Sequence, residues 1–251
     1  MTTMNDFSAA EKALLDTVYD TYTVDRSGQT MAMRKLFMRT FGPFLKGGRG
    51  LELGCSDGFM TEMIAERVDR LDVVDGSKRF LELARRRRLP NVQFVYSLFE
   101  EYETTIRYDY VFASYILEHV RDPVTDMKMA ASVLAPDGLL FIVVPNARAL
   151  SRQLALHMGL VTDLKELTEN DRNHGHRRVY DRVAVNRHIA EAGFECVSQG
   201  GVMLKILADF QMDRLIADGT LTDRHIDGLY ALGLEYPDLC GCLYSVCRIK
   251  S

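Results

Sequence analysis

Leu51-Glu52-Leu53-Gly54-Cys55-Ser56-Asp57-Gly58 is the stretch that decides the fold, because an apolar strand runs directly into a turn bracketed by two glycines. A helical pattern at about 58–67 follows the turn. Glycines let the backbone turn tightly and approach a ligand without a Cβ in the way, and the start of a helix offers N–H groups to a negatively charged moiety. The stretch therefore predicts a strand–turn–helix unit that binds a ligand at its turn.

An acidic residue ends the next apolar run. Asp75 lies 21 residues after Gly54, which is the spacing at which an acid on the second strand of a nucleotide-binding fold reaches ribose hydroxyls. A carboxylate only accepts hydrogen bonds and can take two O–H donors at once. The glycine spacing is G-x-x-x-G, not the G-x-G-x-x-G that seats a pyrophosphate. We therefore expect a ligand with a ribose and no pyrophosphate, rather than a merely solvated acid at a strand end.

Length and composition favour one α/β domain with insertions. The chain has 251 residues, 47% of them hydrophobic, so it can bury a substantial core. Its net charge of −4 opposes a general attraction to polyanions such as nucleic acids. The run of arginines from Arg85 to Arg88 is the candidate basic patch, but it ends a predicted helix, where positive charges complement the helix dipole. Five cysteines without C-x-x-C spacing indicate a reduced, cytoplasmic protein. No apolar run approaches the ~20 residues that span a bilayer. We expect neither a nucleic-acid nor a membrane partner.

Short apolar runs alternate with longer amphipathic ones between residues 49 and 145, which is typical of βα units around a parallel sheet. The predicted strands are 50–53, 71–75, 92–96, 108–113, 139–144, 194–198 and 240–249. The predicted helices of the core are 58–67, 77–88, 115–132 and 181–192.

Three stretches lie outside this alternating core: residues 1–45, 146–180 and 200–238. In an open α/β sheet the ligand sits beyond the carboxyl ends of the strands, and the loops that leave those ends control access to it. We therefore expect a helical cap segment at 1–45 and a main domain at 46–251, with inserts at about 146–180 and 200–238.

Four motifs follow one another along the core. They are Glu52 to Gly58, then Val74-Asp75-Gly76-Ser77, then Leu117-Glu118-His119-Val120 with Asp122-Pro123, and then Leu134 to Leu140 before the fifth strand. In this order they resemble the motifs of class I S-adenosylmethionine-dependent methyltransferases, in the small-molecule branch that includes ubiquinone-type and sugar or natural-product enzymes. The resemblance covers roughly residues 48–146 and implies an α/β fold: a Rossmann-like, doubly wound, seven-stranded, mostly parallel sheet with helical cap insertions.

The resemblance also implies the cofactor, S-adenosyl-L-methionine, with S-adenosyl-L-homocysteine as its product. Gly54, Cys55 and Ser56 would lie against the methionine part, Glu52 would orient their loop, and Asp75 would accept hydrogen bonds from the ribose. The other cofactor-binding residues that we expect are Gly58, Gly76, Ser77, Leu98, Phe99, Ala113, Ser114 and Tyr115.

The chain departs from the family at the end of the third strand. The family often places an acid there to take the adenine amino group, whereas this chain has Leu98. Adenine would then be held by backbone groups of Leu98 and Phe99 and by apolar contact.

A hydroxyl or amine acceptor must lose a proton, and a histidine with an unperturbed pKa of about 6.5 suits that task. His119 is the first candidate, because it follows the fourth strand, although it could equally pack a helix against the sheet. His174, His176 and Tyr180 are further candidates, in a dense polar cluster before the helix at 181–192. Two histidines at i and i+2 lack the third and fourth ligands that zinc requires, so we expect no metal.

Five residues are candidates for substrate binding. Arg177 or Arg178 could grip a carboxylate or phosphate. Tyr19 and Tyr22 could close over the cofactor, and Met203 could line an apolar wall. The alternative is that the arginines tie the cap to the domain, while the aromatics and the methionine belong to the core.

These patterns together predict a methyltransferase (EC 2.1.1.-) that acts on an oxygen or nitrogen atom of a small metabolite, such as a sugar, a natural product or a similar intermediate. We expect a monomer or homodimer. Two alternatives stay open: a catalytically silent S-adenosylmethionine-binding protein and a nicotinamide oxidoreductase. The missing G-x-G-x-x-G spacing speaks against the second.

Overall fold

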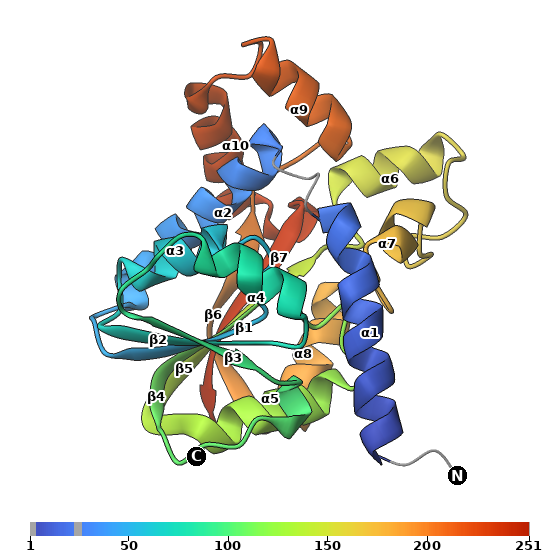
Figure 1. Ribbon diagram of the computed structural model, residues 1–251. Helices are drawn as coiled ribbons and strands as arrows, with labels where there is room; N and C mark the ends of the chain where they lie inside the picture. The colour runs from blue at the N-terminus through green and yellow to red at the C-terminus, as the bar shows by residue number, and fades with distance from the viewer. Residues whose placement is uncertain (1–3, 23–26, 251) are drawn as a thin grey trace.

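The computed structural model describes residues 4–22 and 27–250, and for 4–7 and 20–22 it describes the backbone only. One seven-stranded sheet forms the centre of the fold, in the order β3-β2-β1-β4-β5-β7-β6 (Figure 1). All its pairings are parallel except those of β7, which runs antiparallel to β5 and β6. The strands are β1 (Arg49–Leu53), β2 (Arg70–Asp75), β3 (Val92–Tyr96), β4 (Tyr108–Ser114), β5 (Leu134–Pro145), β6 (Phe194–Val202) and β7 (Cys242–Ile249). The expected seven-stranded, mostly parallel sheet is confirmed.

Helices cover both faces of this sheet, because successive strand residues point to opposite sides. Phe112 and Phe141 face one apolar cluster, while Val111 and Ile142 face the other. The first cluster is closed by α2 (Gly28–Phe41), α3 (Phe59–Ala65), α4 (Lys78–Arg85), α9 (Asp209–Ala217) and α10 (Asp223–Glu235). The second is closed by α5 (Pro123–Val133) and α8 (Arg182–Glu191). This is the doubly wound arrangement that the sequence predicts.

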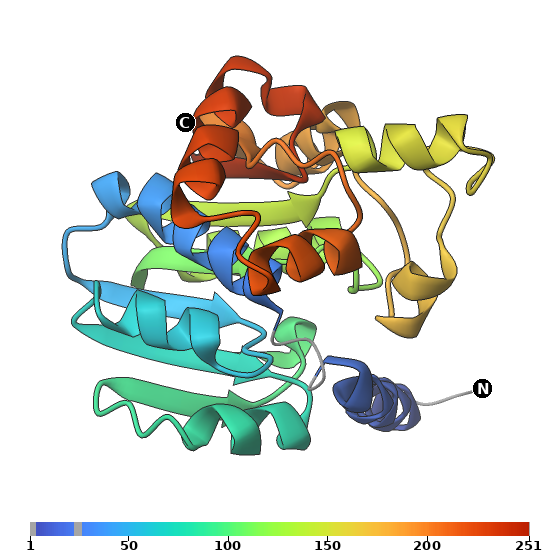
Figure 2. The same cartoon turned by 90° about the horizontal axis from the view of Figure 1, so that it is seen from above.

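The segment expected as an amino-terminal cap divides into two parts. Helix α1 (Met4–Tyr22) lies along one end of the sheet and on neither face (Figures 1 and 2). Helix α2, in contrast, belongs to a face layer, because the rings of Phe41 and Phe141 lie 4.9 Å apart. The first insert carries α6 (Leu150–His157) and α7 (Glu169–Asn173), and the second carries α9 and α10. Single 3-10 turns are η1 (Gly42–Phe44), η2 (Phe99–Glu101) and η3 (Pro237–Leu239).

The helix predicted over 115–132 begins eight residues later, at Pro123. Asp122 caps it by accepting hydrogen bonds from the backbone of Val124 and Thr125, and proline is favoured at the first helical position. Residues 115–122 therefore form a loop at the carboxyl end of β4. This start places Glu118 and His119 on a loop at the edge of the sheet instead of on a helix.

No helix within the described ranges combines the length and the apolar character needed to cross a bilayer.

A buried polar network joins β1, β2 and β4. Asp72 is buried, and its Oδ2 accepts hydrogen bonds from Arg49 at 2.9 Å and from the Tyr108 hydroxyl at 2.7 Å. The Tyr108 hydroxyl also lies 2.7 Å from that of Tyr102. Because Tyr108 is fully buried, its hydroxyl has no access to water if the acceptor is removed.

We predict that Asp72→Ala lowers the free energy of unfolding by about 3 kcal/mol, since it leaves the Arg49 guanidinium without its carboxylate and the two hydroxyls of Tyr102 and Tyr108 with one acceptor fewer. The matched control is Asp227→Ala. Asp227 also pairs with an arginine, Arg39, at 2.8 Å, but these side chains are 65% and 55% exposed, so its loss should cost less than about 1 kcal/mol. Urea unfolding of both variants measures the difference, and equal losses would contradict this account.

Candidate active site

Asp75 ties together the carboxyl ends of β1 and β2. Its Oδ2 accepts a hydrogen bond from the backbone N–H of Cys55 at 2.9 Å, and its Oδ1 accepts one from that of Ser77 at 2.8 Å. The residue is only 6% exposed. Burial raises the pKa of Asp75 above its ordinary value, although these backbone hydrogen bonds oppose the shift. The carboxylate thus fixes both strand-end turns at the edge where the sequence places a ribose.

The turn after β1 is held in an unusual backbone conformation. Gly54 has φ +75°, and a Cβ there would collide with the side chain of Ile116. Ser56 has φ +46°, a region that costs a non-glycine residue about 1–3 kcal/mol and that clusters at ligand clamps. The N–H of Gly54 donates to the carbonyl of Val74 at 2.8 Å, so the turn is anchored to β2.

Gly58 has a packing role that the sequence does not reveal. Its φ is +74°, and a Cβ would lie 2.9 Å from the Cα and Cβ of Ala84 on α4. The glycine is therefore required by the close packing of α3 on α4, and its expected contact with a ligand stays a prediction.

Two buried polar atoms at neighbouring strand ends have no hydrogen-bond partner within the described part of the chain. One is Oε2 of Glu52 on β1, and the other is Oγ of Ser114 on β4. Glu52 is 3% exposed, and its burial raises its pKa to about 8. Buried polar atoms are nearly always satisfied in folded proteins, so a pair of them at one edge of a sheet indicates a ligand site.

Helix α1 covers the ends of β2 and β3. The side chains of Leu15, on α1, and Leu98 meet over Gly76, where a Cβ would lie 2.6 Å and 2.8 Å from their methyl groups. The hydroxyl of Ser77 donates to Asp16 of α1. Leu98 is buried in the position expected beside adenine.

Phe99 flanks the glycine turn, because the end of its ring would lie 3.7 Å from a Cβ on Gly54. Ala113 is buried at the end of β4. Tyr115 has φ +58°, but its side chain leaves the edge: the hydroxyl lies 2.7 Å from Sγ of Cys242 and the ring packs 5.6 Å from that of Phe37. Only the backbone of Tyr115 is therefore placed to meet a cofactor.

Tyr19 holds α1 against α4. Its ring lies 5.2 Å from that of Phe80 and beneath the guanidinium of Arg79 at 4.0 Å. It is partly buried and packs against the first apolar cluster, which agrees with the alternative interpretation, and its expected contact with substrate stays a prediction. The side chain of Tyr22 lies outside the described residues.

The fold brings His119 and His176, far apart in the sequence, into contact. Their ring centroids are 4.7 Å apart at 83°. Burial, followed by the charge of His176, lowers the pKa of His119 to about 3, so its ring is neutral at physiological pH. Glu118 is fully buried beside them: its Oε1 lies 3.9 Å from Nε2 of His119, and burial raises its pKa to about 8. We call Glu118, His119 and His176 the histidine cluster.

Asp171 supports this cluster from the first insert. Its Oδ1 lies 3.2 Å from Nδ1 of His176, and its Oδ2 accepts hydrogen bonds from the N–H and hydroxyl of Thr168. Burial alone would raise the pKa of Asp171, but the hydrogen bonds from His176 and Thr168 hold it below its usual range. His174 lies farther away, with its ring 6.3 Å from that of His176 and its Nδ1 2.8 Å from the carbonyl of Asn170.

Four residues that were expected in the site make structural contacts within the protein. The hydroxyl of Tyr180 is buried, donates to the carbonyl of Leu117 at 3.3 Å, and has a pKa raised by burial. Arg178 donates to carbonyls of the 117–121 loop, and Arg177 donates to the carbonyl of His119 and to Glu11 of α1. The two arginines thus tie the insert to the loop. Met203 is fully buried in the first apolar cluster, so its expected place on a substrate wall is also corrected.

Sequence reasoning missed Glu118 and Asp171. Glu118 stands inside a motif that was recognised, yet nothing in the sequence shows that its carboxylate is buried against a distant histidine. Asp171 does carry a signal, because Thr168-x-x-Asp171 has the spacing of a capping box, and it caps α7 in this way.

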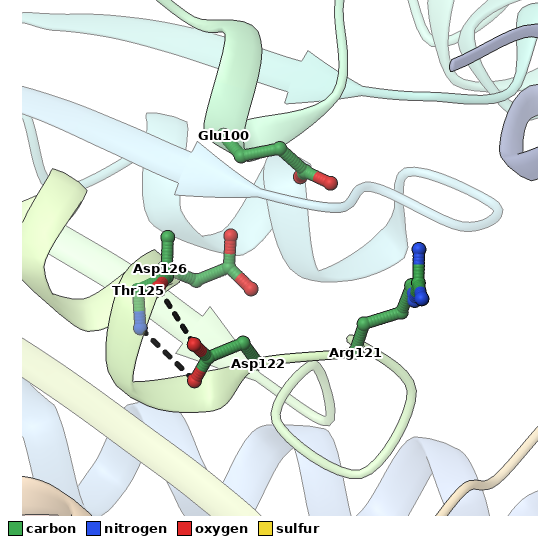
Figure 3. A pocket seen from close by; sticks show the side chains of 5 residues that line it. All are labelled: Glu100, Arg121, Asp122, Thr125 and Asp126. Atoms are coloured by element: carbon green, nitrogen blue, oxygen red, sulfur yellow. Dashed lines mark hydrogen bonds between the residues drawn. The ribbon is translucent and has the colours of Figure 1, made fainter. Parts of the chain in front are cut away.

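A separate pocket of about 350 Å³ opens beside the start of α5 (Figure 3). Its lining residues are Glu100, Arg121, Asp122, Thr125 and Asp126, and Asp122 is turned toward Thr125. Burial and the neighbouring acids raise the pKa of Asp126 to about 7. The pocket contains none of the predicted cofactor or catalytic residues, so we place the candidate site at the strand ends.

Comparison with known proteins agrees with this geometry. The methyltransferase-domain family matches residues 26–199, which is more than half of the chain. The ubiquinone biosynthesis O-methyltransferase of Aeromonas salmonicida is 33% identical over 107 residues, which are 41% of this chain and 45% of the relative. Its namesake from Idiomarina loihiensis is 26% identical over 200 residues, 77% of each chain. In the first of these alignments, and in several others, the chain spans about half the length of the curated relatives.

Solved structures share the fold. The Burkholderia thailandensis 1,6-didemethyltoxoflavin-N1-methyltransferase, solved with 1,6-didemethyltoxoflavin and S-adenosylhomocysteine, superposes with a TM-score of 0.63 at 16% identity. The match covers 100% of this chain and 92% of that one. The chain therefore belongs to the methyltransferase-domain family, and its fold is that of the class I methyltransferases that its motifs resemble.

Proposed function

We propose that the protein transfers a methyl group from S-adenosylmethionine to an oxygen or nitrogen atom of a small molecule in the cytoplasm. The observation that carries this proposal is the buried Asp75, fixed between the turns after β1 and β2 at the spacing that suits a ribose. Family membership supports the same reaction. The similar proteins act on different acceptor atoms, since one name specifies an O-methyltransferase and another an N1-methyltransferase.

The residues at the strand ends fit this cofactor. Asp75 would accept hydrogen bonds from ribose hydroxyls, and the unpartnered Oε2 of Glu52 and Oγ of Ser114 would meet polar groups of the ligand. The backbone of Gly54 offers close approach, and Leu98 supplies an apolar contact for adenine. When bound, the cofactor supplies an electrophilic methyl group on a sulfonium. Leu15 lies over Gly76, so α1 would shift to admit the adenosine.

The acceptor would bind beside the histidine cluster. The neutral ring of His119 can take a proton from a hydroxyl or amine, the ring of His176 packs against it, and the burial of His119 excludes the water that would compete for the proton. Arg177 and Arg178 hold the loop that carries His119, so they position this group without touching the acceptor. We assign proton removal to His119 first and to His176 second.

Asp75→Asn should weaken binding of S-adenosylhomocysteine by about 10–100-fold, because charge-assisted hydrogen bonds contribute about 1.5–3 kcal/mol. Calorimetry measures this affinity. The matched control is Asp69→Asn, since Asp69 also accepts a backbone N–H, from Gly48 at 2.7 Å, but lies at the opposite end of β2. If the unaltered protein fails to bind the ligand at millimolar concentration, the proposed function is wrong.

Glu52→Gln should change how stability depends on pH. The folded pKa of Glu52 is about 8 and its ordinary value is 4.5, so folding retains a proton between these values and the free energy of unfolding falls as pH rises from about 4.5 to about 8. Denaturant unfolding at pH 5 and pH 8 should show a smaller fall in the variant than in the unaltered protein. The exposed Glu66→Gln serves as control. An unchanged fall in Glu52→Gln would refute the assignment.

His119→Asn should lower turnover at least 100-fold, as expected for loss of a proton-transfer group, and leave the affinity for S-adenosylhomocysteine within about twofold. Turnover is followed with methyl-labelled S-adenosylmethionine and a panel of phenols, sugars and amines. His157→Asn, at an exposed position on α6, is the control. Full turnover in His119→Asn would remove the histidine from the mechanism.

A further inference from the structure

The histidine cluster has the donor set of a metal site. Glu118, His119 and His176 each offer one ligand atom, and these atoms all lie within 4.8 Å of one another. The carboxylate of Glu118 is completely buried, and neither of its oxygens has a hydrogen-bond partner among the residues that the structure describes. A buried carboxyl group that lacks a hydrogen-bond partner is costly. A bound cation would supply the missing partner.

The groups behind the two histidines orient them as in metal proteins, where a ligating imidazole usually donates its other N–H to a carboxylate or a backbone carbonyl. His119 is hydrogen-bonded to the backbone of Gly175, and its Nε2 lies on the side of Glu118. Nδ1 of His176 lies 3.2 Å from Asp171, which is itself held by Thr168 and Arg152. Both rings therefore have a polar group of the first insert beside them, and each still places a ring nitrogen within 4.8 Å of the other ligand atoms of the cluster.

We propose that Glu118, His119 and His176 bind one divalent transition-metal ion. Two imidazoles and one carboxylate suit zinc, iron(II), cobalt(II) or manganese(II) better than magnesium or calcium, which prefer all-oxygen sites. Ligand atoms of a tetrahedral ion with ~2.1 Å bonds lie roughly 3.4 Å apart, so the 3.9 Å between Glu118 and His119 closes with a small side-chain rotation. Three protein ligands leave at least one coordination position for another molecule.

This site also narrows the class of acceptor, an inference that rests on the proposed function. An ion with open positions lowers the pKa of a bound hydroxyl, and it holds best an acceptor that offers two neighbouring oxygens, such as a catechol or a vicinal diol. In the metal-bound site His119 and His176 would serve as ligands, so the acidified hydroxyl would give its proton to a water molecule that enters with the acceptor, in place of the transfer to His119 assigned above for the metal-free site.

The test uses the full chain, stripped with a chelator and titrated with cobalt(II) or zinc alone. We expect one equivalent to bind, with the visible absorption of cobalt showing nitrogen ligands. Glu118→Gln should weaken binding more than 100-fold and Asp171→Asn about 10–100-fold, the range for groups behind a ligand. His157→Asn should bind as the unaltered protein does. Absence of stoichiometric binding, or full affinity in Glu118→Gln, would overturn the proposal.

Two further measurements keep the test decisive. Glu118→Gln removes the carboxylate that would bind the ion and keeps the size and shape of the side chain, so the metal-free variant should unfold at no lower temperature than the metal-free protein. If it does misfold, His176→Asn provides the second variant, with the same expected loss of metal. Calorimetry with S-adenosylhomocysteine separates the two proposals: ligand binding without metal binding refutes this site alone, and metal binding without ligand binding refutes the proposed function alone.

Discussion

The buried carboxylate of Asp75 is the constraint on which the site depends. It accepts backbone hydrogen bonds from the turn after β1 and from its own turn after β2, so two neighbouring strands end in a fixed relation. The parallel register continues to β4, whose loop carries Ile116 against Gly54 and then leads to Glu118 and His119. One buried acid thus fixes the turns at the edge of the sheet where the candidate cofactor turn and the histidine cluster both lie.

Several residues at this edge of the sheet have strained backbones or buried polar atoms without partners. Ser56 and Tyr115 adopt left-handed backbone conformations, and Glu52 and Glu118 are buried with unpartnered oxygens. Asp72, also buried, has both an arginine and a tyrosine hydroxyl as partners. Strain and unsatisfied polar groups persist where the surrounding structure enforces them, and they concentrate where ligands bind. Their presence beside Asp75 is consistent with a ligand site at this edge, although Arg88 and Met203 adopt the same backbone region elsewhere in the fold.

The sequence predicted the sheet well because its signals are local. Alternation of buried residues, the glycine turn and the position of Asp75 follow from spacing alone, whereas the contact between His119 and His176 depends on how the first insert folds back over the loop after β4. Arg177 and Arg178 look like ligands for an anion in the sequence, yet carbonyls of that loop occupy them. Tyr180 was likewise read as polar, although its ring fills the core. Asp122 and Pro123 are a typical helix start and mark where α5 begins. The apolar pattern that extends back to residue 115 led to a prediction that began too early.

The most direct measurement is a crystal structure of the protein with S-adenosylhomocysteine. The account predicts that both ribose hydroxyl oxygens lie about 2.5–3.0 Å from the carboxylate of Asp75. It also predicts that α1 is displaced from Gly76 and that the sulfur faces the histidine cluster. A ligand bound at another edge of the sheet, or an Asp75 that keeps only its backbone partners while the ligand is present, would contradict it.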